Sequence, residues 1–235
     1  GGSDAAAEIQ QLCEQLNAIV VSSTSGKGIV PDDHPLSLGG STVRPEVHRI
    51  VPNADVVVAI GTEISETDSF VERLDIRGKM IRIDLDPRKI NDLYPADVGI
   101  VADAAPTVAA LIEAIKKHSP RARRKDNEVL VTNIRNQIKA ELTPSEQQHC
   151  RLLTALRDCI PRNTILAGDV CQLVYSGAFA MPVYSPRSWF YPAGYCTLGA
   201  ALPNAIGAMQ ALPDRPIVAL VGDGGFMFTV QELIT

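Results

Sequence analysis

An apolar run that ends in Gly222-Asp223-Gly224-Gly225 contains the residues of this chain best suited to chemistry. The run, residues 216–221, is typical of a buried strand in a parallel sheet, and open α/β sheets bind ligands beyond the carboxyl ends of such strands. The glycines leave backbone N–H groups accessible to an anion, and Asp223 adds a carboxylate. Because Mg²⁺ takes one or two protein carboxylates and completes its shell from phosphates and water, the turn predicts a metal-bound phosphate.

The same four residues are also compatible with a simple hairpin turn, since Asp-Gly is a common hairpin signal. Two features favour the ligand site. The preceding strand is too uniformly apolar for an exposed hairpin. In addition, Phe226, Val230 and Leu233 repeat at the 3–4 spacing of a helix that begins after the glycines.

Strands and helices alternate in the first half of the chain. Helical spacing covers 4–17 and the segment from Asp103 to Ile115, where Asp103 is a candidate N-cap. The 80–86 strand alternates apolar and charged residues, with Arg82 on the charged face, and is predicted to be half-buried. The predicted strands of this half are 17–21, 55–61, 80–86 and 99–103.

The second half continues the alternation. Its predicted strands are 164–169 and 216–221, and its predicted helices are 128–141, 145–159 and 198–211. A polar and basic run at 119–127 is interpreted as a solvated linker. The order of elements predicts an α/β fold of two domains with parallel sheets flanked by helices.

Composition narrows the classes of function. The 235 residues include 22 Lys and Arg against 27 Asp and Glu, a net charge of −5, which argues against nucleic acid as a partner. No apolar stretch has membrane-spanning length and none has a signal-peptide pattern, so we expect no membrane partner. The five scattered cysteines form no C-x-x-C pair and are typical of reduced thiols in a cytoplasmic protein.

Three segments of the second half occur in the order and at the spacing of a known family: 169–172, 194–208 and 221–226. They resemble the diphosphate-binding domain of thiamine-diphosphate enzymes of the acetolactate synthase and 2-oxo-acid decarboxylase type. The first half is similar to the central domain of that family, at 26–28, 34–36, 54–58, 61–62 and 83–87. The resemblance covers nearly the whole chain and implies a Rossmann-like central domain followed by a thiamine-diphosphate-binding fold.

The resemblance implies cofactor contacts for Val170, Gln172, Cys196, Leu198, Gly222, Asp223, Gly224 and Gly225. Asp223 would ligate Mg²⁺ and so bridge the cofactor diphosphate to the protein. The N–H groups of Gly224 and Gly225 would donate to phosphate oxygens at the positive end of the following helix. Gln172 would reach the diphosphate; the alternative for this residue is a solvent-facing loop amide.

Leu198 matches the bulky apolar residue that holds the cofactor bent in this family. The bent form is needed because the aminopyrimidine must meet the thiazolium carbon to remove its proton. Periodicity alone would favour an ordinary core leucine, and the Thr197-Leu198-Gly199 context favours the specific role. The backbone carbonyl of Cys196 would accept a hydrogen bond from the 4′-amino group.

The resemblance also implies a longer parent enzyme. Family members carry the catalytic glutamate in an N-terminal pyrimidine-binding domain, and an Asn after the glycines is their second side-chain metal ligand. We therefore expect a central domain without its first strand at 1–118, a linker at 119–144, and a truncated diphosphate-binding domain at 145–235. Such a fragment would hold no catalytic residue and be inactive alone, and its parent would be a homodimer or homotetramer with the site between subunits.

Two positions depart from close acetolactate synthases. Leu173 replaces a histidine, which removes one diphosphate contact of the family pattern. Residues 62–68, with three acids, replace an Arg-Phe-Asp-Asp segment, which argues against acetolactate synthesis. These acids would repel an anionic dinucleotide, so we do not expect FAD. The implied function is decarboxylation of a small 2-oxo acid, with protonation or ligation of the resulting enamine, and segments 61–63 and 191–195 suggest a substrate with a basic side chain. The alternatives are acetolactate synthase proper, with or without FAD, and a non-catalytic nucleotide-binding or structural module.

Overall fold

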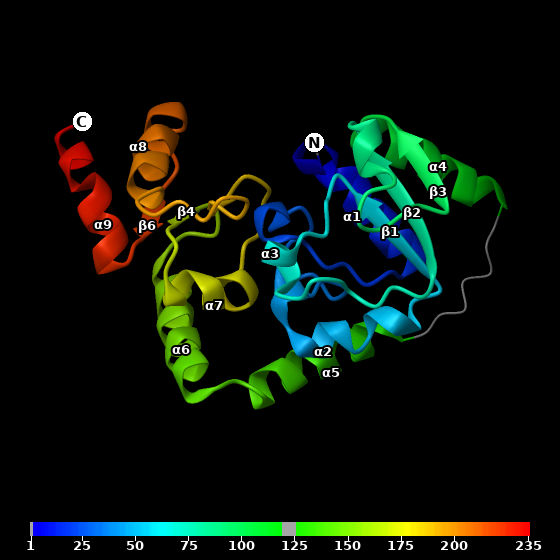
Figure 1. Cartoon of the computed structure of the whole chain (residues 1–235), viewed down its shortest axis with the longest axis horizontal. Helices are drawn as coiled ribbons and strands as arrows, with labels where there is room; N and C mark the ends of the chain where they lie inside the picture. The colour runs from blue at the N-terminus through cyan, green and yellow to red at the C-terminus, as the bar shows by residue number, and fades with distance from the viewer. Residues whose placement is uncertain (1, 119–125) are drawn as a thin grey trace.

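Two parallel three-stranded sheets form the framework of the residues that the computed structural model describes, 2–118 and 126–235. The strand orders are β1-β2-β3 and β5-β4-β6. Helices flank both sheets (Figure 1). The predicted α/β fold with parallel sheets is therefore confirmed.

The first sheet consists of β1 (Val56–Ile60), β2 (Lys79–Asp84) and β3 (Val98–Val101). Helices α1 (Ala6–Leu16) and α4 (Ala104–His118) pack on one of its faces, and the short helices α2 (Pro45–His48) and α3 (Glu66–Ser69) lie outside the sheet. Leu12, Val108 and Ile112 meet Ile83 in the core between these helices and the sheet. As predicted, the Asp103 carboxylate caps α4, accepting from the backbone N–H of Ala105 at 3.0 Å.

Two predictions for this half are wrong. The predicted strand at 17–21 is reduced to an isolated bridge between Val20 and Ser37, since α1 ends at Leu16 and the chain turns through Asn17 in a left-handed conformation. The charged face of β2 is buried at Arg82, because residues around Leu74 and Tyr94 cover it there, whereas Asp84 on the same face is half-buried. Arg82 is only 1% exposed there.

The second sheet consists of β4 (Ile165–Gly168), β5 (Trp189–Phe190) and β6 (Ile217–Leu220). The helices of this half are α5 (Asn127–Ala140), α6 (Pro144–Cys159), α7 (Gln172–Ala180), α8 (Ala201–Ala211) and α9 (Asp223–Thr229). Thr143 and Glu146 form a capping box at the start of α6. Helix α7 and strand β5 were not predicted, because α7 is apolar on nearly every side and β5 is only two residues long.

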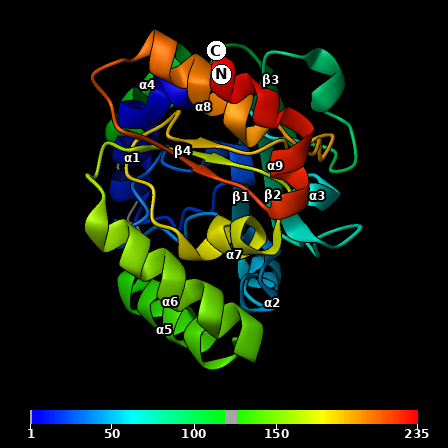
Figure 2. The ribbon, with the colours of Figure 1, turned by 90° about the vertical axis from the view of Figure 1, so that its left-hand side faces the viewer.

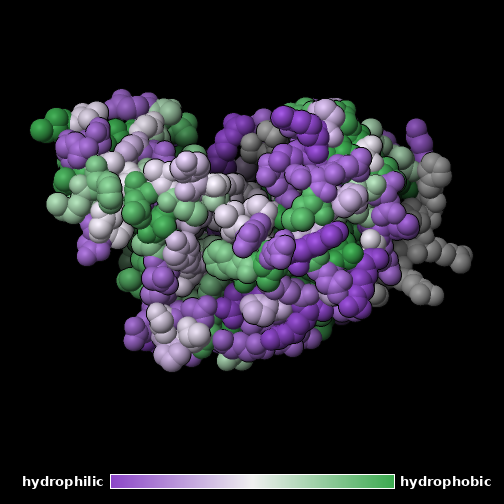
Figure 3. Space-filling model, viewed as in Figure 1, coloured by the Kyte–Doolittle hydropathy of each residue, from purple (hydrophilic) through white to green (hydrophobic). Residues whose placement is uncertain are grey.

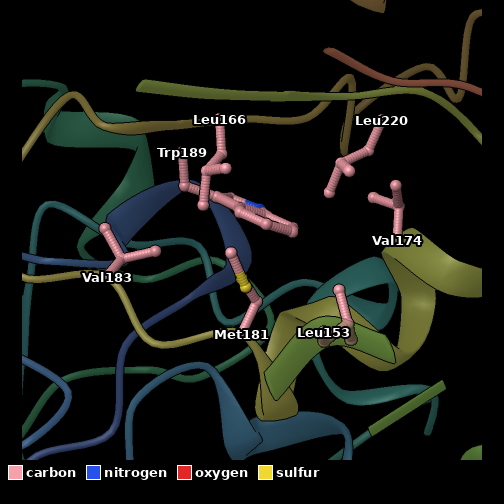
Figure 4. Close-up of a cluster of buried hydrophobic side chains, with 7 residues drawn as sticks. All are labelled: Leu153, Leu166, Val174, Met181, Val183, Trp189 and Leu220. Carbon is pink, nitrogen blue, oxygen red and sulfur yellow. The ribbon is translucent and has the colours of Figure 1, made fainter. Parts of the chain in front are cut away.

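The core of the second half lies between its sheet and α6 and α7. Figure 4 shows the Trp189 ring in the middle of this cluster, between Leu166 and Met181. Leu153 from α6 and Leu220 from β6 belong to the same cluster. This packing fixes β4 against β6.

Buried polar contacts join the two halves. The Lys27 side chain is almost fully buried; its Nζ pairs with Asp32 at 2.8 Å and donates to the carbonyl of Ala178, at the end of α7, at 2.9 Å. The other oxygen of Asp32 accepts no hydrogen bond from the described residues. The Asp32 carboxylate also accepts from the backbone N–H of Val183 at 2.9 Å, so one ion pair ties the first half both to α7 and to the segment that follows it.

Most of the predicted linker, 119–144, is helical. Residues 119–125, which include most of the basic run, lie outside the described residues. Helix α5 follows and packs on Val47 of α2 through Val131 and Ile134, so this part of the segment is attached to the first half. The domain limits of 1–118, 119–144 and 145–235 stay predictions. Of the helices that the structure describes, none has the length and apolar character to span a membrane.

Candidate functional site

The predicted site lies where the connections of the second sheet diverge. Strand β4 is central: its chain continues through α7 to β5 on one side, and β6 pairs with its other side, with Gly168 opposite Leu220. Figure 2 shows α8 and α7 on opposite sides of β4. The carboxyl ends of β4 and β6 therefore border the crevice in which open α/β sheets bind ligands.

The glycine turn at the end of β6 leads into a helix and not into a hairpin. Gly222 has the extended conformation of an N-cap, and α9 begins at Asp223. Asp223 is exposed, and its Oδ1 accepts from the backbone N–H of Gly224 at 2.9 Å. A Cβ at Gly224 would meet nothing within 4 Å, so the space beside this glycine is open.

The two predicted residues that follow β4 lie beside the glycine turn. A Cβ at Gly222 would be 3.2 Å from Cβ of Cys171, which immediately precedes α7. Gln172, the first residue of α7, is exposed, and Val170 is half-buried. Val170, Gln172 and Gly222 are thus brought together, as the shared sheet edge requires.

Residues 191–199 form an irregular segment between β5 and α8. Cys196 has a φ of 54°, is exposed, and its backbone N–H donates to the carbonyl of Pro192 at 2.7 Å. Leu198 is 45% exposed, so it is not an ordinary core leucine. Burial, reinforced by the neighbouring Tyr175 and Cys196, raises the pKa of Tyr191. The Tyr191 hydroxyl therefore stays protonated at neutral pH, 4.0 Å from Sγ of Cys196.

Asp169 belongs to this site, although no role was predicted for it. It follows β4 and is 0% exposed. Its Oδ1 accepts from the backbone N–H groups of Val170 at 2.7 Å and Gly199 at 3.1 Å, and its Oδ2 from that of Ala201 at 3.4 Å. The sequence feature that could have indicated this role is an isolated acid directly after an apolar strand. Such an acid is buried only where the protein supplies hydrogen-bond donors for it.

The donor set suits a cation that is shared with a phosphate. Among the described residues there is no group of three or more His, Cys, Asp or Glu side chains able to hold a metal by itself. A single exposed carboxylate beside a glycine with open space around its Cα instead matches Mg²⁺, which takes most of its ligands from phosphates and water. The arrangement can hold a diphosphate at the start of α9.

Two family models match the chain. The thiamine pyrophosphate enzyme central domain matches residues 1–111, and the C-terminal TPP binding domain of thiamine pyrophosphate enzymes matches residues 169–235. Thiamine pyrophosphate is another name for thiamine diphosphate. The second match begins at Asp169 and includes every residue for which a cofactor contact was predicted.

Curated relatives match along the whole chain. A probable 2-ketoarginine decarboxylase of Pseudomonas aeruginosa is 40% identical over 240 residues, which are 100% of this chain and 42% of that protein. The acetolactate synthase isozyme 1 large subunit of Escherichia coli is 30% identical, with 100% and 42% covered. A probable acetolactate synthase large subunit of Methanococcus aeolicus is 32% identical, with 99% and 42% covered. The chain therefore spans 42% of the length of these relatives.

Proposed function

Since the chain belongs to the thiamine pyrophosphate enzymes, we propose that it is part of a thiamine-diphosphate- and Mg²⁺-dependent enzyme that decarboxylates a 2-oxo acid. The observation that carries the proposal is the exposed Asp223 beside the open Gly224 at the switch point of the second sheet. The cofactor would supply the electron sink for loss of CO₂. The residues of this chain would bind and orient the cofactor.

Each predicted residue has a distinct task in this proposal. Asp223 would ligate Mg²⁺, and the N–H groups of Gly224 and Gly225 would donate to the diphosphate. Gln172, at the start of α7, would reach the diphosphate from the neighbouring strand end. Leu198 keeps 45% of its surface exposed, which leaves an apolar side chain free to support a bound molecule.

The substrate we propose is a 2-oxo acid with a basic side chain. The relative that is 40% identical bears the name 2-ketoarginine decarboxylase, whereas the acetolactate synthase subunits named above are 30% and 32% identical. The three acids at 62–68 would repel an anionic dinucleotide, so FAD is not part of the proposal. Acetolactate synthesis remains the alternative activity.

We also propose that the active enzyme is longer than this chain and oligomeric. The glutamate that activates the cofactor and the second side-chain metal ligand would lie outside these 235 residues, so the chain alone would be inactive. Exposed apolar side chains on α9 and on the turn after it favour a protein partner at this surface. These side chains are Met227, Phe228, Leu233 and Ile234. Figure 3 shows apolar residues at this end of the molecule. A cytoplasmic location fits the five unpaired cysteines.

Cofactor titration tests the metal assignment. In the full-length protein, Asp223→Ala should abolish Mg²⁺-dependent binding of thiamine diphosphate, measured by calorimetry with and without Mg²⁺. Asp214→Ala is the matched control, because Asp214 is an exposed acid before the opposite end of β6. If Asp223→Ala binds the cofactor as tightly as the parent, the metal assignment is wrong.

A panel of 2-oxo acids tests the substrate class. The full-length enzyme should release CO₂ from 2-ketoarginine faster than from pyruvate at equal concentration. Formation of acetolactate from pyruvate as the main reaction would instead establish the alternative activity. A bound flavin or ADP in pure protein, without Mg²⁺-dependent binding of thiamine diphosphate, would favour a nucleotide-binding module.

A further inference from the structure

We propose that Asp169 is a positioning residue that fixes the Leu198–Gly199 segment and the Gly222–Gly225 turn relative to each other. The proposal rests on the proposed function in one respect, namely that these two segments hold the same cofactor. Its structural part concerns only contacts of the cofactor-free chain. Asp169 itself would touch neither substrate nor cofactor, because it is 0% exposed.

The first contact holds the segment before α8. The Asp169 carboxylate accepts from Gly199 N–H at 3.1 Å and from Ala201 N–H at 3.4 Å. Ala201 is the first residue of α8, so the carboxylate also faces the positive end of an eleven-residue helix. Leu198 directly precedes Gly199, so the hydrogen bond from Gly199 to Asp169 also sets the position of Leu198.

The second contact is with the glycine turn. Gly225 is buried, and a Cβ added there would lie 3.0 Å from Cγ of Asp169 and 3.1 Å from each of its oxygens. Glycine thus lets α9 approach the carboxylate closely. Gly199 packs on α9 as well: its φ is 82°, and its carbonyl accepts from the Thr229 hydroxyl at 3.1 Å. Asp169, Gly199 and Gly225 form one contact, which we call the Asp169 anchor.

The carboxylate of Asp169 distinguishes this anchor from apolar packing between the same two segments. Among the described residues no Lys, Arg or His side chain lies within ion-pair distance of Asp169, so backbone N–H groups alone solvate it. A buried carboxylate is costly without hydrogen bonds, and each N–H that moves away leaves it less well solvated. The carboxylate therefore resists displacement of either segment. A neutral side chain of the same size would lack this property.

Amide hydrogen exchange tests the anchor in the cofactor-free full-length protein. Asp169→Ala should speed exchange of the Gly199 and Ala201 amides by about tenfold or more, the factor that corresponds to loss of one hydrogen bond. Asp169→Asn keeps one acceptor oxygen but turns an NH₂ group toward Ala201 or Gly199, so one of the two amides should exchange faster and the other stay protected. Emission of Trp189, the single tryptophan, reports whether each variant is folded.

The control is Glu46→Gln. Glu46 is also buried, but it pairs with Arg44 in the first half, at 3.0 Å. This variant should be less stable than the parent and yet leave the difference in protection between Gly199 and the core amides of β4 unchanged. If instead Glu46→Gln exposes Gly199 as strongly as Asp169→Ala does, the effect is general destabilisation and the proposal is wrong.

Cofactor affinity tests the consequence. For folded Asp169→Ala, the Kd for thiamine diphosphate with Mg²⁺ should rise about tenfold or more, and for Asp169→Asn by less. Unchanged exchange at both Gly199 and Ala201 in both variants would overturn the anchor. If Asp169→Ala does not fold, exchange of the Gly199 and Ala201 amides in Asp169→Asn decides the question. Absence of cofactor binding in the parent would refute the proposed function, whereas the exchange results would still decide the structural part.

Discussion

The carboxyl ends of the two parallel sheets differ in whether their polar groups are engaged or exposed. At the carboxyl end of the first sheet, Arg82 and Glu63 are both engaged by other groups of the protein. Arg82 donates to the carbonyl of Thr62 at 2.8 Å, and Glu63 pairs with Lys89 at 2.9 Å. At the carboxyl end of the second sheet, Asp223 is exposed, and the space beside Gly224 is open. Sheets of the same architecture thus differ in what they can bind.

The difference teaches that residues after the strands, and not the sheet itself, decide binding. At the first sheet, Glu63 is paired with Lys89, and the buried Arg82 is engaged with backbone carbonyls. At the second, glycines and one free carboxylate suit a metal-bound diphosphate. Substitutions at the two ends should therefore separate stability from cofactor binding.

The largest expected effect is on stability at the first sheet. Arg82→Ala should lower the free energy of unfolding by about 3 kcal/mol, because it opens a cavity and leaves two buried carbonyls unpaired. Urea denaturation followed by far-ultraviolet circular dichroism measures this change. Affinity for thiamine diphosphate should stay within twofold of the parent.

Arg88→Ala is the control for Arg82→Ala. The Arg88 side chain is 87% exposed, so its removal should change the free energy of unfolding far less than Arg82→Ala does. A Kd for thiamine diphosphate that rises together with the instability of Arg82→Ala would show that the first sheet takes part in cofactor binding. The contrast between the two sheets would then fail.

Adjacent glycines at the second sheet should respond in opposite ways. Gly225→Ala should lower the free energy of unfolding by about 1–3 kcal/mol, because its Cβ would press on Asp169. Gly224→Ala should leave stability unchanged or raise it by up to about 1 kcal/mol, since alanine favours the helix and meets open space. Thermal unfolding distinguishes them.

Cofactor affinity distinguishes Gly224→Ala and Gly225→Ala further. Gly224→Ala should weaken binding of thiamine diphosphate although the protein is no less stable, because the methyl group enters the space proposed for the diphosphate. Equal affinity in Gly224→Ala and the parent would place the diphosphate elsewhere. Equal stability of the two variants would contradict the close approach of Gly225 to Asp169.

The smallest expected effect concerns the pKa of Asp86, at the first sheet. Hydrogen bonds from the Arg88 side chain and backbone lower the pKa of Asp86 from 3.8 to about 2. Because the pKa is lower in the folded state, the pair contributes stability above about pH 4, and this contribution is lost as the pH falls toward 2. Carboxyl carbon shifts in NMR spectra measure the pKa directly.

Arg88→Ala should return the pKa of Asp86 toward 3.8 if the ion pair is its cause. A parent in which Asp86 already titrates near 3.8 would mean that this pair does not persist in solution. The acids at the end of the first sheet would then be less neutralised than the geometry indicates, and the contrast with Asp223 would be smaller.

Sequence patterns predicted the framework better than the contacts within it. Helices α1, α4, α5 and α6 and all the longer strands follow the predicted ranges closely, because their apolar spacing is regular. Helix α7 lacks a polar side, and so its residues give no helical periodicity to detect. The burial of Arg82 was equally hidden, since it depends on a loop that covers the sheet from 12 residues away, at Tyr94.

By itself, the sequence determined the class of the protein and selected the residues that we propose for its site. Runs of apolar residues ending in glycine and aspartate, at family spacing, were enough to identify the thiamine pyrophosphate enzymes and to select Gln172, Leu198 and Asp223. Only the tertiary structure decided which acid is open and which is buried. Asp169 and Asp223 both follow an apolar strand, and local sequence cannot distinguish them. The difference arises because Gly199, Ala201 and Gly225, distant in the chain, close around Asp169 and leave Asp223 exposed to solvent.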